Sequence, residues 1–204
     1  MLSASPELKE RVDQYVKEFG KIYAPILHPD FASTPSNHTD ERFGMILPRL
    51  APAGGTVLDI GTHWGYMAHR LEDEGYKVTA IEHTDRHFEF LRDIKALCQK
   101  DFKIIHGDVF DLTEIKFDIV LALSVFHHFL KTKAKFEKFE ALLERTQCGM
   151  MIFQPHAVSE PQMRGAYRNM DQDEFAAFVA SRLRLKSVTV IGTEHGRNLY
   201  KISS

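Results

Sequence analysis

The sequence predicts a single α/β domain, in which a doubly wound, mostly parallel sheet of seven strands ends in an antiparallel C-terminal hairpin. Strand-like and helix-like patterns alternate from residue 56 onward, as in successive βαβ units. The segment 117–123 is almost entirely apolar, which is typical of a central parallel strand covered on both faces. The last two strand patterns are joined by a short connection without a helix, so these two strands must be antiparallel.

The first 50 residues precede this alternation, and we expect them to form a helical lid or cap on the domain of residues 51–204. Apolar side chains at helical spacing predict a helix over 6–20. Several Pro and Ser residues predict a loop over 24–40, and a second apolar-faced helix ends before Pro52. Such a segment can order over a ligand and exclude water, so we expect it to line an acceptor pocket.

From residue 56 each element follows from its own pattern. Short apolar runs predict strands at 56–60, 77–82, 103–106, 117–123 and 150–154, and hairpin strands at about 185–191 and 198–203. Helices are predicted between them: one to about Glu74, one after Thr84 as N-cap, one over 131–147, and one from Asp171 to about Arg184.

Composition excludes several classes of protein. The 204 residues carry a formal net charge of −2, which disfavours a general binder of nucleic acid. No apolar run approaches the roughly 18–20 residues of a membrane span, and no signal peptide is visible. Cys98 and Cys148 fit reduced thiols, so we expect a cytoplasmic protein. The eleven histidines are scattered and form no HExxH motif, so no metal site is expected.

The first candidate site is the turn after the first predicted strand. It reads Asp59-Ile60-Gly61-Thr62-His63-Trp64-Gly65-Tyr66, where the two glycines allow a ligand to approach the backbone closely. In open α/β sheets, ligands bind beyond the carboxyl ends of the strands, where the strand order reverses. A carboxylate at Asp59 repels a pyrophosphate and suits a ligand with an ammonium group. Taken alone, such a turn also serves for packing.

Further strand ends carry suitable groups in the same order, namely Glu82-His83, Asp108-Val109-Phe110 and Ser124-Val125. An acidic residue at the position of Glu82 can accept both hydroxyl groups of a ribose. The carboxylate of Asp108 can accept a hydrogen bond from an adenine amino group, while the backbone of Val109 pairs with the ring. The structural alternatives are a helix-start carboxylate for Glu82 and an ordinary turn residue for Asp108.

Residues 54–154 resemble a class I S-adenosylmethionine-dependent methyltransferase. The segments VLDIGTHWGYMAHRL, VTAIEH, IIHGDVFDL and FDIVLALSVFHHF are similar to the family's glycine-rich, ribose-binding, adenine-contacting and fourth motifs. The resemblance implies S-adenosylmethionine as donor and S-adenosylhomocysteine as product. It implies a donor site made by Asp59, Gly61, Thr62, His63, Gly65, Tyr66, Glu82, His83, Asp108, Val109, Phe110, Ser124 and Val125.

Two residues bear on the methionine part of the donor. His63 stands where the family usually has a middle glycine, which affects contact with the methionine tail. Arg42 begins the second predicted helix and is a candidate partner for the methionine carboxylate. Its alternative is a solvated arginine at a helix end.

A narrower resemblance concerns the acceptor. ALSVFHHFL and the final GRNLYKISS are similar to the methyltransferase part of enzymes that cap bacterial surface polysaccharides such as O-antigens. This implies transfer to an oxygen, either a sugar hydroxyl or a phosphate, on a small molecule or glycan. Nucleic-acid bases are disfavoured, because no Asn/Asp-Pro-Pro-Tyr/Phe run follows the fourth strand. Ser124 and Gln154 at the ends of strands four and five do not offer the carboxylates of a magnesium site.

His127 and His128 are the candidate catalytic residues. An imidazole can take a proton from a hydroxyl acceptor, whereas a cationic His or Arg197 would orient a phosphate. Adjacent residues in a turn rarely point the same way, so we expect one functional histidine and favour His128. In the structural alternative, one of the two caps the next helix or packs in the core. His156 is a further candidate.

Two other classes of function stay open. An NAD-linked oxidoreductase or epimerase is disfavoured by the missing GxGxxG and Tyr-x-x-x-Lys patterns. A non-catalytic module with a methyltransferase-like fold is disfavoured because a scaffold does not need Asp59, Gly61, Glu82 and Asp108 together. The sequence indicates neither the identity of the acceptor nor an oligomeric state.

Overall fold

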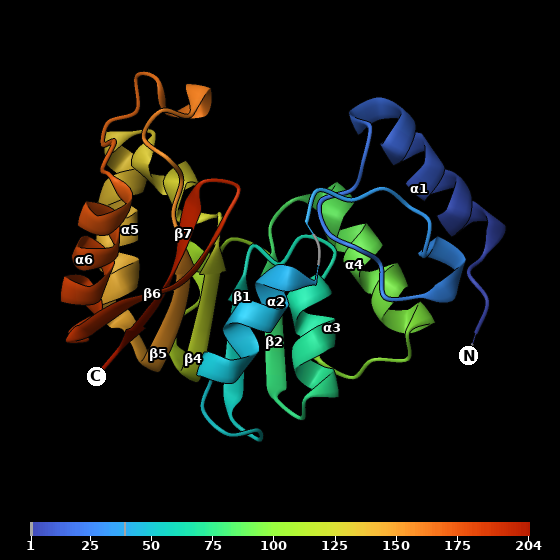
Figure 1. Ribbon diagram of the computed structural model, residues 1–204, viewed down its shortest axis with the longest axis horizontal. Helices are drawn as coiled ribbons and strands as arrows, with labels where there is room; N and C mark the ends of the chain where they lie inside the picture. The colour runs from blue at the N-terminus through green and yellow to red at the C-terminus, as the bar shows by residue number, and fades with distance from the viewer. Residues whose placement is uncertain (1, 39) are drawn as a thin grey trace.

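The fold is built on one mixed sheet, seen edge-on in Figure 1. A computed structural model describes residues 2–38 and 40–204. Within them the sheet has seven strands in the order β3-β2-β1-β4-β5-β7-β6. The strands are β1 (Thr56–Ile60), β2 (Lys77–Glu82), β3 (Lys103–His106), β4 (Ile115–Leu123), β5 (Thr146–Gln154), β6 (Ser187–Glu194) and β7 (Arg197–Ser203). The order reverses between β1 and β4, which places a ligand site at their carboxyl ends.

The predicted fold class is confirmed. Strands β1 to β5 pair in parallel, while β7 is antiparallel to both β5 and β6. The strands β4 and β5 each begin earlier than predicted. The sequence pattern missed their first residues because these are partly exposed and do not form an apolar run. Those two strand starts pair with each other, with the exposed Lys116 opposite the exposed Gln147.

The helices are α1 (Pro6–Phe19), α2 (Glu41–Ile46), α3 (Tyr66–Asp73), α4 (Asp85–Leu97), α5 (Lys133–Arg145) and α6 (Gln172–Leu183). Short 3₁₀ turns lie at Pro29–Phe31, Leu47–Arg49, Val109–Asp111, Phe126–Leu130 and Pro161–Met163. The second helix is shorter than predicted and passes into the 3₁₀ turn that contains Pro48, which has no backbone N–H to continue it.

Capping explains where two other helices begin. Helix α5 starts at Lys133 because Thr132 Oγ1 accepts the N–H of Lys135 at 3.3 Å. The predicted cap of α6 is confirmed, since Asp171 Oδ1 accepts the N–H of Glu174 at 2.8 Å. Thr84 stands at the start of α4 as predicted, but its side chain makes no capping hydrogen bond.

Alternating side chains of the strands supply two cores, one on each face of the sheet. On one face Leu58, Val120 and Phe153 pack with residues of α5 and α6. On the other face Val57 and Leu121 pack with residues of α2 and α3. Among the described residues, no helix is long and apolar enough to span a lipid bilayer.

A third core joins the N-terminal segment to α4. Tyr15 of α1 packs against Trp64 at 4.8 Å between ring centroids, and Trp64 stacks on Phe90 of α4 at 4.1 Å. Arg11 of α1 also pairs with Asp93 of α4 at 2.6 Å. In Figure 1 helix α1 accordingly lies beside α4, away from α5 and α6.

Candidate functional site

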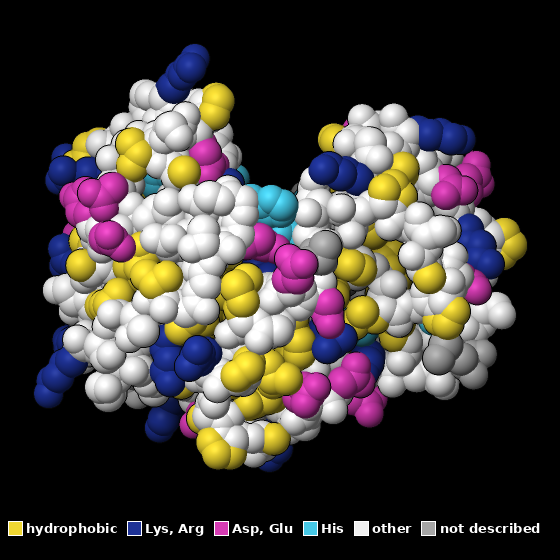
Figure 2. Space-filling view, viewed as in Figure 1, with side chains coloured by type: hydrophobic (Ala, Val, Ile, Leu, Met, Phe, Trp, Pro, Cys, Tyr) yellow, Lys and Arg dark blue, Asp and Glu magenta, His cyan; other side chains and the backbone are white. Residues whose placement is uncertain are grey.

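Two connected hollows lie at the carboxyl ends of the parallel strands. The larger encloses about 1270 Å³, part of it open to solvent, and the smaller about 540 Å³. They meet at Tyr23, Gly61 and His63. Figure 2 shows a notch in the molecular surface with histidine side chains at its floor. We call the two hollows together the cleft.

The turn after β1 is held against β2 by backbone hydrogen bonds. The N–H groups of Gly61 and Thr62 both donate to Ile81 O, at 3.0 and 3.2 Å. His63 has φ +57°, a left-handed conformation that glycine adopts without strain. A glycine, which the resemblance leads one to expect at this position, would adopt this conformation without strain. The His63 ring lies between Tyr23 and His87, at 5.2 and 4.1 Å between centroids.

The two glycines of the turn have different surroundings. A Cβ on Gly61 would lie 2.9 Å from Val125 Cγ2, and both residues line the cleft. A Cβ on Gly65 would lie 2.5 Å from Leu91 Cδ1, and Gly65 does not line either hollow. Gly65 therefore serves the packing of α4 on the turn, while Gly61 also leaves room at the site.

Glu82 is buried at the end of β2, and both of its carboxylate oxygens are in use. Oε2 accepts the N–H of His63 and Oε1 accepts the N–H of Thr84, each at 2.9 Å. His83 is exposed, with Nδ1 3.5 Å from Glu82 Oε1. Because a carboxylate oxygen has two lone pairs, Glu82 can hold the turn and still accept ligand hydroxyl groups from the cleft.

Asp59 is fully buried beneath the turn. Its Oδ2 accepts the hydroxyl proton of Thr62 at 2.5 Å. Burial raises the pKa of this carboxyl group to about 6; the negative charge of Glu82 adds to the rise, while Thr62 and Arg42 oppose it. A carboxylate that lacks a cationic partner in this way is suited to bind an ammonium group.

Asp108 lies at the far end of the cleft with Val109 and Phe110. It is exposed, and its Oδ1 accepts the N–H of Phe110 at 3.1 Å, which caps the 3₁₀ turn. The predicted turn role is thus present, and the exposed carboxylate also faces the cleft as the donor role requires.

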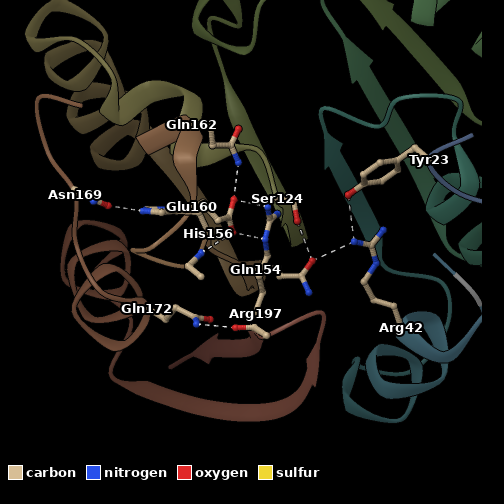
Figure 3. Close-up of polar contacts among 12 residues, drawn as sticks. Tyr23, Arg42, Ser124, Gln154, His156, Glu160, Gln162, Asn169, Gln172 and Arg197 are labelled. Carbon is tan, nitrogen blue, oxygen red and sulfur yellow. Dashed lines mark hydrogen bonds and ion pairs between the residues drawn. The ribbon is translucent and has the colours of Figure 1, made fainter. Parts of the chain in front are cut away.

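Arg42 is only 2% exposed, so the alternative of a solvated helix-end arginine is wrong. Its Nη1 donates to Tyr23 Oη at 3.3 Å and to Gln154 Oε1 at 3.1 Å. Gln154 Oε1 also accepts the hydroxyl proton of Ser124 at 2.9 Å. Figure 3 shows this chain of contacts from the N-terminal segment to the ends of β4 and β5. Arg42 and Tyr66 line the smaller hollow together with Asp59.

The two adjacent histidines lie in different surroundings. His128 is exposed and lines the cleft, whereas His127 is 4% exposed and does not. Although the His128 side chain reaches solvent, the protein around it removes part of the ring from water, which lowers its pKa to about 4 together with the charges of Lys131, His83, Lys135 and Arg197. Burial, with the charge of His128 and Arg197, lowers the pKa of His127 to about 3.

Behind His127 lies a polar cluster that the sequence did not group together. Arg197 donates from Nε and Nη2 to the two carboxylate oxygens of Glu160, at 2.8 and 2.7 Å. His156 is fully buried, and its Nε2 lies 2.9 Å from Asn169 Oδ1. Figure 3 shows these side chains on the other side of Gln154 from Arg42. His156 is therefore held in the core, and Arg197 is neutralised by Glu160.

Three residues of the site went unnoticed in the sequence. Tyr23 lines both hollows, Glu194 lies 3.6 Å from Arg42 Nε, and Glu160 pairs with Arg197. Tyr23 belongs to a segment that reads as loop, and both glutamates lie in or beside turns, so no local pattern marks them.

The residues present fit the donor that the resemblance implies. Glu82 and the Asp108–Phe110 turn offer hydrogen-bonding groups for a nucleoside in the larger hollow. Asp59 and Arg42 offer opposite charges for an amino-acid group in the smaller one. The backbone N–H groups of Gly61, Thr62 and His63 are already paired, which disfavours a pyrophosphate site at this turn.

Comparison with known proteins agrees with this geometry. Residues 58–146 match the family model of a methyltransferase domain. No curated protein matches the chain significantly. Among solved structures, monomeric WbdD superposes with TM-score 0.72 at 22% identity, over 94% of this chain and 48% of that one. The chain thus spans about half the length of WbdD.

Two more solved structures share the fold at lower identity. PH0226 protein from Pyrococcus horikoshii OT3 gives TM-score 0.64 at 17% identity, over 93% of this chain and 98% of that one. Magnesium protoporphyrin IX methyltransferase (ChlM) from Synechocystis PCC 6803, with bound SAM, gives TM-score 0.60 at 16% identity, over 81% and 77%.

Proposed function

We propose that this class I S-adenosylmethionine-dependent methyltransferase, whose methyltransferase domain spans residues 58–146, methylates a phosphate oxygen of a small molecule or glycan. The observation that carries the acceptor class is the electrostatic setting of His128. Burial lowers the pKa of His128 first, and the positive charges of Lys131, His83, Lys135 and Arg197 lower it further. Because Glu160 neutralises Arg197, an anionic acceptor at this mouth of the cleft gains mainly from Lys131 and from Lys135, which lines the cleft.

A hydroxyl acceptor is less well served by the same residues. It needs a base that accepts its proton, and a base works best when its pKa lies near the working pH. His128 has a pKa of about 4 and His127 of about 3, so each is a weak base at neutral pH. An anionic phosphate oxygen needs no proton removed.

The donor supplies an electrophilic methyl group on a sulfonium. In the proposed reaction a phosphate oxygen forms the new O–C bond as the C–S bond breaks, and the sulfur keeps the electron pair. Glu82 binds and orients the ribose, Asp59 holds the ammonium group, and Arg42 holds the carboxylate. The role of His128 is to orient the phosphate by donating a hydrogen bond.

One similar protein supports a phosphorylated acceptor. WbdD is described as a bifunctional kinase-methyltransferase. A kinase makes phosphate esters, so the two activities in one chain are consistent with methylation of a phosphate. We extend this acceptor class to the present chain as part of the proposal.

The test compares matched acceptors under single-turnover conditions. The purified chain is incubated with methyl-labelled donor and either a hexose phosphate or the same hexose without phosphate, and product is followed by mass spectrometry. We expect label on the phosphorylated sugar only, in a methyl phosphodiester. Label on a carbon-bound hydroxyl of either sugar, with a rate that falls as pH decreases, would instead establish a hydroxyl acceptor.

A further inference from the structure

His38, Glu194 and His195 form a cluster beside the cleft. One ligand atom from each of them lies within 4.8 Å of the others. His38 Nδ1 is 3.0 Å from Glu194 Oε2, and the two side chains are only 11% and 9% exposed. Neither atom has a hydrogen-bond partner among the described residues. The two buried atoms are thus in ion-pair contact without the geometry of a hydrogen bond, and Arg42 Nε lies 3.6 Å from the same carboxylate oxygen.

The orientation of His195 fits that of a metal ligand. Its Nε2 lies 3.2 Å from the backbone oxygen of Asn37. A carbonyl oxygen can only accept, so Nε2 carries the proton and Nδ1 keeps its lone pair. Histidines that bind metals characteristically donate their other ring N–H to a carbonyl or carboxylate. His195 and Gly196 have φ of +51° and +74°, which the two-residue turn between β6 and β7 requires.

The donor atoms of the cluster suit a divalent cation, because it offers two imidazoles and one carboxylate.

We propose that His38, Glu194 and His195 bind one Zn²⁺ ion, which fastens the N-terminal segment to the β6–β7 turn. Two histidines and one glutamate, with a fourth position left to water, are a recurrent zinc donor set. Ligand atoms around tetrahedral zinc lie about 3.4 Å apart, from Zn–N and Zn–O bonds of about 2.0–2.1 Å. The exposed His195 can make the small side-chain movement that closes the cluster to this spacing.

Arg42 is the charge that opposes this ion. Its Nε lies 3.6 Å from Glu194 Oε2, while its Nη1 is directed to Tyr23 and Gln154. Repulsion at this range lowers the affinity for a cation. The usual zinc motifs do not reveal this site, because its ligands come from opposite ends of the chain.

The ion would act on the position of Tyr23. The N–H of His38 donates to Tyr23 O at 3.0 Å, and the two rings lie 4.4 Å apart. Tyr23 lines both hollows of the cleft. Zinc at the cluster therefore fixes the part of the lid that borders the donor and acceptor sites.

The experiment titrates the metal-free full-length chain with Zn²⁺ by calorimetry and with Co²⁺ by visible absorption. We expect one equivalent to bind, with the d–d bands of a tetrahedral nitrogen and oxygen site. His195→Ala and Glu194→Gln should each weaken binding at least about 10-fold. His106→Ala is the matched control, since His106 is another histidine paired with a carboxylate, Asp85, at 3.0 Å.

Thermal unfolding gives a second readout. Zn²⁺ should raise the Tm of the wild type and of His106→Ala but not that of His195→Ala. Because His195 is exposed, we expect the His195→Ala variant to fold. Absence of stoichiometric binding, or equal binding by His195→Ala, would overturn the proposal. Cobalt–thiolate charge-transfer bands would also overturn it, because they would assign the metal to Cys98 or Cys148.

Discussion

The carboxylate of Glu82 accepts the backbone N–H of His63 at 2.9 Å, so the end of β2 holds the turn that follows β1. One side chain thus shapes the turn and faces the ligand site. The two tasks can be separated by substitution.

Glu82→Gln should weaken donor binding by about 1–3 kcal/mol, because ribose hydroxyl groups lose a charged acceptor. Glu82→Ala should weaken it further, because it also releases the N–H groups of His63 and Thr84. Calorimetry with S-adenosylhomocysteine measures both. Equal affinity of the wild type and both variants would remove Glu82 from the donor site.

Donor affinity should fall as pH decreases through about 6, the raised pKa of Asp59. Only the ionised carboxylate binds an ammonium group, so the loss approaches tenfold for each pH unit below that value. Titrations at about pH 5 and about pH 8 measure it. Asp59→Asn should bind the donor weakly, with an affinity that changes little with pH. If the affinity of that variant fell with pH as steeply as that of the wild type, a group other than Asp59 would be titrating.

The same pKa has the opposite consequence for the donor-free protein. The folded-state pKa of about 6 lies above the usual pKa of an aspartate, so the unfolded chain loses this proton first as pH rises. The contribution of Asp59 to stability therefore decreases between these two pH values. Chemical denaturation of the wild type and Asp59→Asn across this window checks the sign.

The backbone of His63 allows a test of strain. A left-handed φ costs about 1–2 kcal/mol for a residue with a Cβ and nothing for glycine. His63→Gly should therefore be more stable than His63→Ala by about 1 kcal/mol in urea unfolding. A more stable alanine variant would show that the turn relaxes to another conformation.

The two adjacent histidines should respond differently to removal. His127→Ala should cost about 1–3 kcal/mol of unfolding free energy, because that ring is buried. His128→Ala should change stability by less than about 0.5 kcal/mol while raising the KM for a phosphorylated acceptor several-fold. Thermal unfolding measures the effect on stability, and steady-state kinetics measures the effect on KM. Unchanged turnover in His128→Ala would show that His128 is not needed and that catalysis depends on alignment of the reactants alone.

Trp64 is the single tryptophan of the chain and reports on the N-terminal segment. It is 5% exposed and covered by Tyr15 of α1. Deleting residues 1–20 should shift its fluorescence to longer wavelength and cost about 3 kcal/mol or more, because Trp64 and Phe90 lose their cover. Leu2→Ser, at an exposed position of the same segment, is the control and should change neither. An unshifted emission maximum after deletion would show that α1 does not cover Trp64.

The sequence predicted those parts of the molecule that depend on local pattern. The strands at 56–60, 77–82 and 103–106 have the predicted bounds, since each is a short run between turn residues. The order of the strand ends also placed Asp59, Glu82 and Asp108 along one edge of the sheet.

Contacts between distant segments could not be predicted in this way. Arg42 is buried because Tyr23, Gln154 and Glu194 surround it, and these three lie in separate parts of the chain. Likewise, the polar starts of β4 and β5 become strands because they pair with each other, not because either has a strand-like pattern.

The sheet order also constrains how the chain assembles. Strand β6 is made before β7 but reaches the sheet only through it, because β7 lies between β5 and β6. On the ribosome, β6 therefore waits without its neighbour until residues 197–203 have emerged. Tyr200 and Ile202 of that last strand are buried in the core beside α6, so the hydrophobic interior also stays open until then. Strands β1 to β5 can pair earlier, so the hairpin completes the sheet in the last step of folding. Until the hairpin arrives, the unpaired edge of β5 can pair with strands of other chains during synthesis.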